Sequence, residues 1–233
     1  MSTLVRNKIF LENPYTGFDD SIYPVDLQGW GHDDPNFEKV IKELRPTLII
    51  EVGTWKGASA IEMSKISKRN GIQNEIVCVD TWLGSLEFVT KEGDEGRATP
   101  LENETFNEIR RGLARKYGYP GVYYQFLANI LRSGNADVIT PFPQTSTIAA
   151  RFFVIHNIQA SLIYLDGSHD EKDVYEDIEN YWKVLSPGGI MIGDDYNEWV
   201  TVKKAVDRFA KDSGLTVEIS ESRRQWMMRK LKC

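Results

Sequence analysis

"LIIEVGTWKGASA", residues 48–60, runs from an apolar segment of strand length into a helix through a turn that contains two glycines. Gly53 and Gly57 suit this turn because glycine tolerates sharp backbone bends, lets a ligand approach the backbone and allows close packing of the helix on the strand. The dinucleotide pattern G-x-G-x-x-G lacks its middle glycine here, and Trp55 stands where a pyrophosphate would need bare backbone. The stretch therefore indicates either a nucleotide-type ligand site or a tight turn that binds nothing.

Strand-length apolar runs and amphipathic helices alternate around this stretch. The strands are expected at 47–52, 75–80, 137–142, 161–166 and 189–194, and the helices at 35–46, 58–69, 122–132, 146–155, 171–185 and 198–212. Such alternation predicts an α/β fold in which a parallel sheet carries helices on both faces. Two further runs, 215–220 and 224–231, are close enough in the sequence to pair as an antiparallel hairpin.

The chain is expected to form one domain with additions. Residues 1–34 are rich in Gly, Pro, Asp and aromatic residues without a sustained period, so we expect an irregular N-terminal arm. Residues 35–233 then form the α/β domain. The polar segment at about 84–120 interrupts the alternation and is too long for a plain loop, which predicts an insertion with a helix around 103–118.

Composition argues against several classes of protein. The formal net charge of -6 over 233 residues disfavours a nucleic-acid-binding surface, and the basic segment 222–232 is expected to be a final strand with solvated charges. No run approaches the roughly 20 apolar residues that cross a bilayer, and no signal peptide is visible, so a soluble cytoplasmic protein is expected. Cys78 and Cys233 provide neither a disulfide framework nor a thiolate metal cluster. A homo-oligomer is left open.

The second predicted strand ends in Asp80, a candidate for ligand binding. A carboxylate at this position can accept hydrogen bonds from both ribose hydroxyls of a nucleotide-type ligand, although it could also cap the turn. Trp82 could cover an adenine ring or be buried in the core. After the third predicted strand, Gln144 and Ser146 are candidates for contacting the adenine edge.

Three carboxylates end the fourth and fifth predicted strands: Asp166, Asp194 and Asp195. In a parallel sheet these ends lie at one edge, with neighbouring strands about 4.8 Å apart. Two like charges 4 Å apart repel by about 4 kcal/mol at an effective dielectric constant near 20, so the cluster needs a cation or protons. Oxygen ligands favour Mg²⁺, with Mn²⁺ or Ca²⁺ possible. Alternatively, Asp166 and Asp195 cap the helices that follow them.

Three segments resemble a known family: "EVGTWKGASA" (51–60), "CVDTW" (78–82) and "LIYLDGSHDEKDVYEDIENYWKVLSPGGIMIGDDY" (162–196). They are similar to the class I S-adenosylmethionine-dependent methyltransferases, especially the metal-dependent sugar O-methyltransferases of macrolide and aminocoumarin biosynthesis. The similarity extends over about residues 35–230. It implies a Rossmann-like, seven-stranded, mostly parallel sheet with an antiparallel hairpin at one edge.

The resemblance also assigns roles to individual residues. It implies S-adenosylmethionine at Gly53, Gly57 and Asp80, and Mg²⁺ at Asp166, Asp194 and Asp195. From their positions in the sequence we also expect Glu51, Thr54, Trp82 and Ser146 to contribute to cofactor binding. In the aminocoumarin type of enzyme an aspartate thought to act as base occupies the position of Ser168. His169, with an ordinary pKa of about 6.5, is the obvious substitute, and Asp166 is the other catalytic candidate. The alternative for His169 is an exposed residue in the first turn of a helix.

The predicted reaction is the divalent-metal-dependent transfer of a methyl group from S-adenosylmethionine to a hydroxyl of a small polar acceptor, a sugar or glycan. The metal would ligate that hydroxyl and lower its pKa, while His169 or a neighbouring carboxylate takes the proton. The arm and the insertion are expected to wall the acceptor side, where Trp30 either stacks on a sugar or is buried. The alternatives are a phenolic or catechol acceptor, a nicotinamide-dependent oxidoreductase and a non-catalytic binding module.

Overall fold

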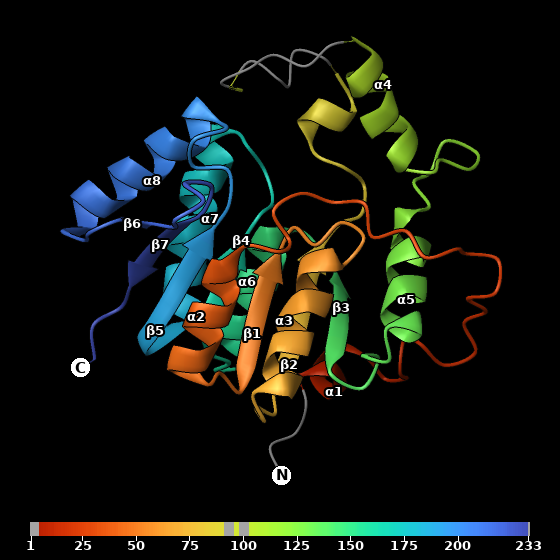
Figure 1. Ribbon diagram of the computed structural model, residues 1–233, viewed down its shortest axis with the longest axis horizontal. Helices are drawn as coiled ribbons and strands as arrows, with labels where there is room; N and C mark the ends of the chain where they lie inside the picture. Colours follow the sequence, from red (N-terminus) through yellow and green to blue (C-terminus); the bar gives the residue numbers. More distant parts are fainter. Residues whose placement is uncertain (1–4, 91–95, 98–102, 233) are drawn as a thin grey trace.

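The computed structural model describes residues 5–90, 96–97 and 103–232. Its centre is one sheet with helices on both faces (Figure 1). The strands are β1 (Leu48–Val52), β2 (Glu75–Asp80), β3 (Ile139–Pro143), β4 (Ala160–Leu165), β5 (Leu185–Gly193), β6 (Glu218–Ile219) and β7 (Trp226–Arg229). Their order is β3-β2-β1-β4-β5-β7-β6. The first five strands are parallel and β7 is antiparallel to both of its neighbours, which confirms the predicted seven-stranded, mostly parallel sheet.

Each face of the sheet has its own apolar core. The helices are α1 (Arg6–Ile9), α2 (Pro35–Leu44), α3 (Ala58–Arg69), η1 (Leu86–Phe88, 3₁₀), α4 (Asn103–Gly112), α5 (Val122–Arg132), α6 (Ser146–Ile155), α7 (Glu171–Val184) and α8 (Val200–Ser213). Ile50 and Val52 of β1 pack with α6, α7 and α8, whereas Ile49 packs with α2, α3 and α5. Side chains alternate between the faces of a strand, so β1 needs apolar residues on both sides.

The C-terminal hairpin forms as predicted, although its extent differs from the prediction. Only Glu218 and Ile219 pair with β7, so β6 is much shorter than the predicted run at 215–220. In the sheet, β7 lies between β5 and β6, and its buried face is packed against the end of β5. Gly193 pairs with Trp226, and the indole ring of Trp226 lies over Gly193, where a Cβ atom would overlap it. The basic segment before β7 is therefore brought to the carboxyl end of β5.

The N-terminal arm is attached to the domain at the amino end of the sheet and returns to its carboxyl edge. The backbone N–H groups of Val5 and Arg6 donate to the buried carboxylate of Glu75, at 2.7 and 3.0 Å. Tyr15 donates its hydroxyl to the carbonyl of Ile139 at 2.9 Å. Further along, the arm crosses near the ends of β1 and β4, and η1 and α4 lie on the same side of the molecule (Figure 1). Among the described residues, no helix is both long and apolar enough to span a membrane.

Candidate active site

A cavity of about 430 Å³ opens at the carboxyl edge of the sheet. Gly53 and Asp80, from the ends of β1 and β2, line one part of it. Asp166 and Asp195, which follow β4 and β5, line another part. The structure therefore brings the two predicted groups, one for a nucleotide-type ligand and one for a metal, to a single cavity.

The turn after β1 is built against the end of β4. Gly53 has a φ of +80°, and a Cβ atom at this position would overlap the backbone of Asp166, so only glycine fits. Gly57 has a φ of +86° and lies against the rings and methyl groups of Phe126 and Ile130 of α5. The two glycines thus serve close packing as well as the turn, and Gly53 places the first strand end directly beside the acids.

Asp80 joins the end of β2 to this turn. One of its carboxylate oxygens accepts the backbone N–H groups of Thr54 and Trp55, each at 3.0 Å, and the other accepts the N–H of Trp82 at 2.7 Å. Burial raises the pKa of Asp80, while these backbone hydrogen bonds favour its ionised form. The carboxylate still lines the cavity and retains lone pairs for further donors.

Glu51 lies beneath the turn, outside the cavity lining. Its fully buried carboxylate accepts hydrogen bonds from the hydroxyls of Thr54 and Ser59 and from the thiol of Cys78. Burial raises the pKa of Glu51 to about 7. Any contribution of Glu51 to ligand binding therefore acts through the turn that it holds, since no direct path to the cavity is open.

Trp82 and Ser146, the remaining predicted cofactor residues, both line the cavity. Trp82 is nevertheless almost fully buried, and its indole N–H donates to the carbonyl of Trp55 at 2.8 Å. The hydroxyl of Ser146 donates to the carboxylate of Asp177 at 2.5 Å. Burial raises the pKa of Asp177 to about 7, so this end of the cavity holds a weakly acidic hydrogen-bonding pair that the sequence did not suggest.

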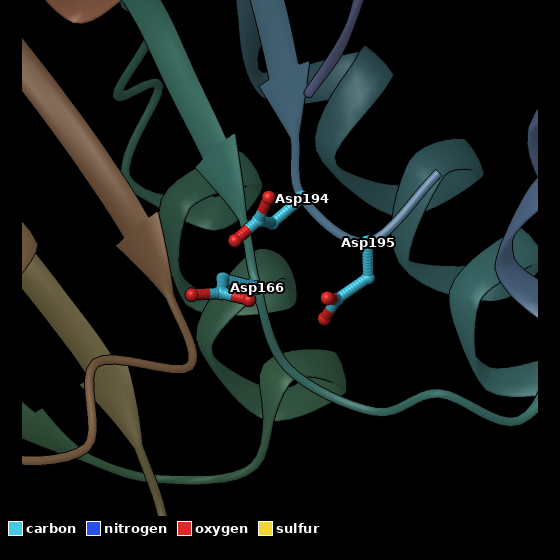
Figure 2. Close-up of side chains that lie close together, drawn as sticks. All are labelled: Asp166, Asp194 and Asp195. Atoms are coloured by element: carbon cyan, nitrogen blue, oxygen red, sulfur yellow. The ribbon is translucent and has the colours of Figure 1, made fainter. Parts of the chain in front are cut away.

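Asp166, Asp194 and Asp195 form an acid cluster, with one carboxylate oxygen from each lying within 4.8 Å of the others (Figure 2). The alternative that Asp166 and Asp195 act as helix caps is wrong, because α7 is capped by Asp170 and the residue before α8 is Trp199, which makes no side-chain cap. The carboxylates are therefore free of a capping role.

Burial and mutual repulsion perturb the pKa values in the cluster. Burial, followed by the charges of Asp194 and Asp195, raises the pKa of Asp166 well above its usual range. Burial and the charge of Asp195 likewise raise the pKa of Asp194 to about 6. The pKa of Asp195 is lowered, because the hydrogen bond and charge of His169 outweigh its burial. The cluster thus carries less than three negative charges at neutral pH, as expected for like charges held together.

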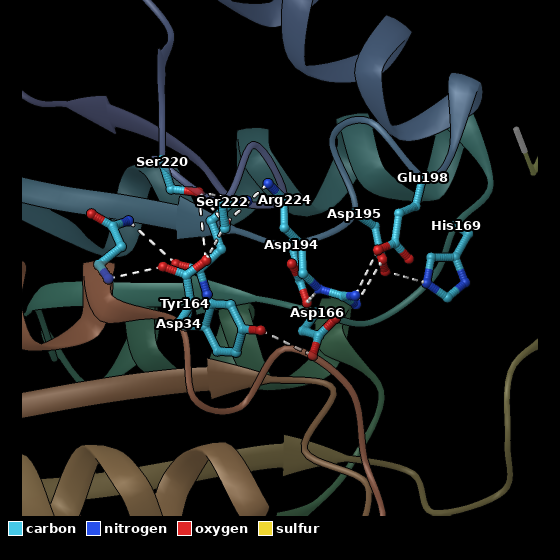
Figure 3. Close-up of polar contacts among 12 residues, drawn as sticks. Asp34, Tyr164, Asp166, His169, Asp194, Asp195, Glu198, Ser220, Ser222 and Arg224 are labelled. Atoms are coloured by element: carbon cyan, nitrogen blue, oxygen red, sulfur yellow. Dashed lines mark hydrogen bonds and ion pairs between the residues drawn. The ribbon is translucent and has the colours of Figure 1, made fainter.

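Arg224, which precedes β7, supplies a cation to the cluster (Figure 3). Its guanidinium donates to Asp194 at 2.8 Å, to Asp195 at 3.1 Å and to Glu198 at 2.6 Å. The prediction that the basic C-terminal segment has solvated charges is therefore wrong for Arg224, whose side chain is only 21% exposed. The sequence does not reveal this pairing, because the carboxylates that Arg224 contacts are distant in the chain and are brought to it by the β5–β7 pairing.

His169 is held between two carboxylates rather than exposed on its helix. Its Nε2 lies 2.8 Å from Asp195 and its Nδ1 lies 2.9 Å from Glu87 of η1, while its ring stacks on Trp199 with centroids 4.2 Å apart. Burial lowers the pKa of His169, but the two carboxylates outweigh it and raise the pKa to about 10. The expectation of a histidine with an ordinary pKa of 6.5 is therefore wrong: His169 is an imidazolium at neutral pH in this arrangement.

The acid cluster fits a hard divalent cation in three respects. Its ligands are all oxygens. Oδ1 of Asp194, a residue only 3% exposed, has no hydrogen-bond partner among the described residues, and such an orphaned buried oxygen calls for a cation or a proton. A second cavity of about 20 Å³, enough for one water-sized species, is lined by all three acids. One oxygen of each acid lies within 4.8 Å of the other two, so a single hard cation could be held by all three residues.

Several residues at the site were not found from the sequence. Glu87 and Arg97 come from the polar segment 84–120, and Glu198 and Trp199 from the turn before α8; all four line the cavity. Glu87 carried no local signal, because its role depends on His169, 82 residues away in the chain. The sequence "DDYNEW" held a partial signal: Trp199, four residues after the strand-end acid pair, lines the cavity, whereas Tyr196, directly after the pair, does not.

The strand order, the glycine turn and the acids at the strand ends define a class I methyltransferase fold with its ligand cavity at the carboxyl edge. A model of the methyltransferase domain family matches residues 50–196, which is more than half of the chain. The chain therefore belongs to this methyltransferase family, and the family expected from the sequence is confirmed. The nicotinamide-dependent oxidoreductase is correspondingly disfavoured.

Solved methyltransferase structures share this fold. The O-methyltransferase NovP is 18% identical, with 84% of this chain and 78% of that chain covered and a TM-score of 0.55. The calicheamicin methyltransferase CalS11 is 13% identical, with coverage of 83% and 77% and a TM-score of 0.54. TomG from Streptomyces achromogenes, solved with S-adenosylmethionine, is 10% identical, with coverage of 89% and 83% and a TM-score of 0.53. No curated protein sequence matches the chain significantly.

Proposed function

We propose that the protein is a divalent-metal-dependent O-methyltransferase that transfers the methyl group of S-adenosylmethionine to a hydroxyl of a small polyhydroxylated acceptor, a sugar or glycan. One observation carries the proposal: Asp166 and Asp195 of the acid cluster line the same cavity as Gly53 and Thr54 of the turn, and Asp194 lies within 4.8 Å of the other two acids. A methyl donor at the turn and a hydroxyl at the acids would then be neighbours. Binding both reactants in one orientation removes much of the entropic barrier to reaction.

The cofactor half of the cavity is formed by the first two strand ends. Gly53 and Thr54 offer backbone close to the ligand, and Asp80 offers its carboxylate to the ribose hydroxyls. Ser146 and Asp177 lie where the adenine would extend, and an Asp–Ser pair can accept hydrogen bonds from an exocyclic amine. When bound, S-adenosylmethionine supplies an electrophilic methyl group on its sulfonium.

Asp166, Asp194 and Asp195 would hold the metal, with Mg²⁺ as the first candidate and Mn²⁺ or Ca²⁺ as alternatives. A divalent cation at this position would lower the pKa of an acceptor hydroxyl. Neighbouring residues hold these carboxylates in place. Tyr164 donates its hydroxyl to Asp166 at 3.1 Å and so restrains the Asp166 carboxylate, which lines the cavity. The fixed carboxylates also position the acceptor relative to the turn.

His169 is the proposed proton acceptor, because it faces the acid cluster from the cavity. As an imidazolium between Asp195 and Glu87 it has no free lone pair, so it must first lose a proton and give up one of these contacts. Asp195 and Glu87 fix its orientation, and stacking on Trp199 fixes its plane. A carboxylate of the cluster is the other residue that could receive the proton.

The acceptor half of the cavity favours a hydroxyl-rich molecule. The carboxylates of Glu87 and Glu198 line the cavity beside His169 and Arg224, and each can accept hydrogen bonds from hydroxyl groups. Trp30 of the arm, 48% exposed, presents an aromatic face at the same cavity. Such a wall of acids with one open aromatic suits a sugar more than an apolar phenol.

The test uses the full chain with S-adenosylmethionine and a panel of sugars, glycosides and catechols, and it follows the formation of S-adenosylhomocysteine. We expect turnover with Mg²⁺ and a sugar, loss of turnover in EDTA, and a loss of at least about a hundredfold in Asp194→Asn and His169→Gln, the scale typical of general acid–base residues. The matched control is Asp207→Asn on the exposed side of α8, which should retain activity.

Each part of the proposal has its own contrary result. Full turnover in EDTA would refute metal dependence, and turnover confined to catechols would move the acceptor to the phenolic class. Calorimetry separates a silent module from an enzyme that lacks its acceptor in the panel. A protein that binds S-adenosylmethionine but no divalent cation, and turns over no acceptor, would favour the module.

A further inference from the structure

The position of Arg224 is fixed by its backbone as well as by its side chain. The N–H of Tyr196, just after β5, donates to the carbonyl of Arg224 at 3.0 Å. Two residues earlier, the hydroxyl of Ser222 donates to Asp34, the cap of α2, at 2.5 Å. The turn between β6 and β7 is thus tied both to the end of β5 and to the start of α2. Arg224 therefore projects from a rigid support rather than from a free surface loop.

The guanidinium of Arg224 is bonded through all three of its nitrogens. Nε contacts Asp194, Nη2 contacts Asp195 and Nη1 contacts Glu198 (Figure 3). The arm covers this arrangement, since a Cβ atom on Gly31 would overlap both Nε of Arg224 and Oδ2 of Asp194. Gly31 has a φ of +63° and lets the arm backbone approach this closely. The ion pairs are consequently shielded from solvent and are stronger than those on the surface.

The carboxylates that Arg224 contacts are also two of the three metal-ligand candidates. Arg224 uses Oδ2 of Asp194 and Oδ1 of Asp195, whereas Oδ1 of Asp194 is left without a partner. Arginine keeps its charge at all accessible pH values. A divalent cation at the cluster would therefore lie close to a permanent positive charge that already neutralises its ligands, and the two cations would repel each other.

We propose that Arg224 is the built-in counter-ion of the acid cluster and that it competes with a divalent cation for Asp194 and Asp195. Arg224 stabilises the carboxylates while no metal is bound, and it weakens metal binding because it occupies Oδ2 of Asp194 and Oδ1 of Asp195 and repels the ion. The inference rests on the proposed function, because it concerns the metal that this cluster would hold.

The test measures Mg²⁺ and Mn²⁺ binding to the full chain by calorimetry, without any acceptor. In Arg224→Gln the Kd is expected to fall by at least about tenfold, because one repelling charge is removed. Arg224→Lys keeps the positive charge but loses the three-nitrogen fork, so its Kd is expected to lie between those of the wild type and Arg224→Gln. Arg229→Gln is the matched control, since Arg229 also bridges two carboxylates, Glu43 and Glu218, away from the cluster.

Thermal unfolding provides a second readout. Arg224→Gln should have a lower Tm than the wild type in EDTA and should regain more of it in millimolar Mg²⁺, because the ion replaces the lost charge. If this variant fails to fold in EDTA, refolding on addition of Mg²⁺ supports the proposal and failure to refold overturns it.

The outcomes separate this inference from the proposed function. Equal Kd values in the wild type and Arg224→Gln would overturn the competition and leave the metal in place. Metal binding only in Arg224→Gln would support the competition and overturn the metal requirement of the wild type. Folded proteins that bind no metal in either form would overturn both.

Discussion

Glu51 has a different physical role from the one that its place in the sequence pattern predicts. An acid at the end of the first strand suggested contact with a cofactor, but the side chain points into the interior and is bonded to Thr54, Ser59 and Cys78. Those donors compensate only part of its burial, so the pKa is raised to about 7. The native state therefore holds a proton on Glu51 at pH values where the unfolded chain has lost it.

This difference makes the stability depend on pH. Because the pKa of this acid is higher in the folded state than its unfolded value of about 4.3, its stabilising proton is fully present at low pH and is lost as the pH rises towards 7. The wild type should lose about 2 to 3 kcal/mol of unfolding free energy as the pH rises from 5 to 8, because Glu51 must ionise in the folded state. Glu51→Gln has no such group and should not show this loss. Urea unfolding across this range checks the difference.

The control for this prediction is Glu62→Gln on α3, where the partly exposed Glu62 pairs with Lys65 and Arg69. Its curve should run parallel to that of the wild type. A Glu51→Gln curve that is also parallel would mean that Glu51 is ionised in the native protein.

At the scale of elements, the site is made by the meeting of strand ends. The parallel register of β1, β2 and β4 brings the turn after β1 against the backbone that follows β4. Gly53 is the contact point, because its missing side chain is what lets the two ends touch. A residue chosen for local turn geometry thus also sets the distance between the cofactor half and the acid half of the cavity.

Two glycine substitutions distinguish the cost of backbone strain at a positive φ from the cost of steric overlap with β4. Gly53→Ala combines a positive φ with overlap against the backbone of Asp166, so we expect a loss of more than about 3 kcal/mol of stability. Gly71→Ala has a φ of +61° and open space around it, so only the backbone strain of about 1 kcal/mol is expected. Urea unfolding of both variants compares them, and equal losses would show that the contact with β4 carries no energetic weight.

At the scale of the whole molecule, the cavity depends on parts of the chain that lie outside the sheet. The arm contributes Trp30 and His32, and the segment after β2 contributes Glu87, Phe88 and Arg97. The arm is bound to the domain at several points, including the ion pair of Lys56 with Asp26 at 2.6 Å. The strand ends therefore supply one part of the cavity wall, while the arm and the segment after β2 supply another.

Trp30→Ala tests the division of the cavity between sheet and arm. Because Trp30 is half exposed, stability should change by no more than about 1 kcal/mol. The KM for an acceptor identified in the panel should rise about tenfold, corresponding to the loss of one stacking contact, while the Kd for S-adenosylmethionine stays unchanged. Tyr117→Ala, 97% exposed and outside the cavity lining, is the control. A parallel change in cofactor affinity would place Trp30 on the cofactor side instead.

Much of the fold was predictable, because it depends on local patterns. The alternation of apolar runs with amphipathic helices predicted the parallel sheet, and the acids that end the fourth and fifth strands predicted a cluster at one edge. Element ends were less predictable: β5 starts at Leu185, earlier than expected, because that residue pairs with Ala160 across an irregularity in the ladder. Pairing partners of this kind are distant in the sequence.

The sequence by itself determined the order of strands and helices, the glycine turn and the identity of the three acids, since each is encoded by neighbouring residues. Only the tertiary structure decided how the charges are balanced. Arg224 reaches the cluster through the β5–β7 pairing, and Glu87 meets His169 from a separate segment. The physical reason is that periodicity and turn chemistry act along the chain, whereas electrostatic compensation acts through space between residues that folding brings together.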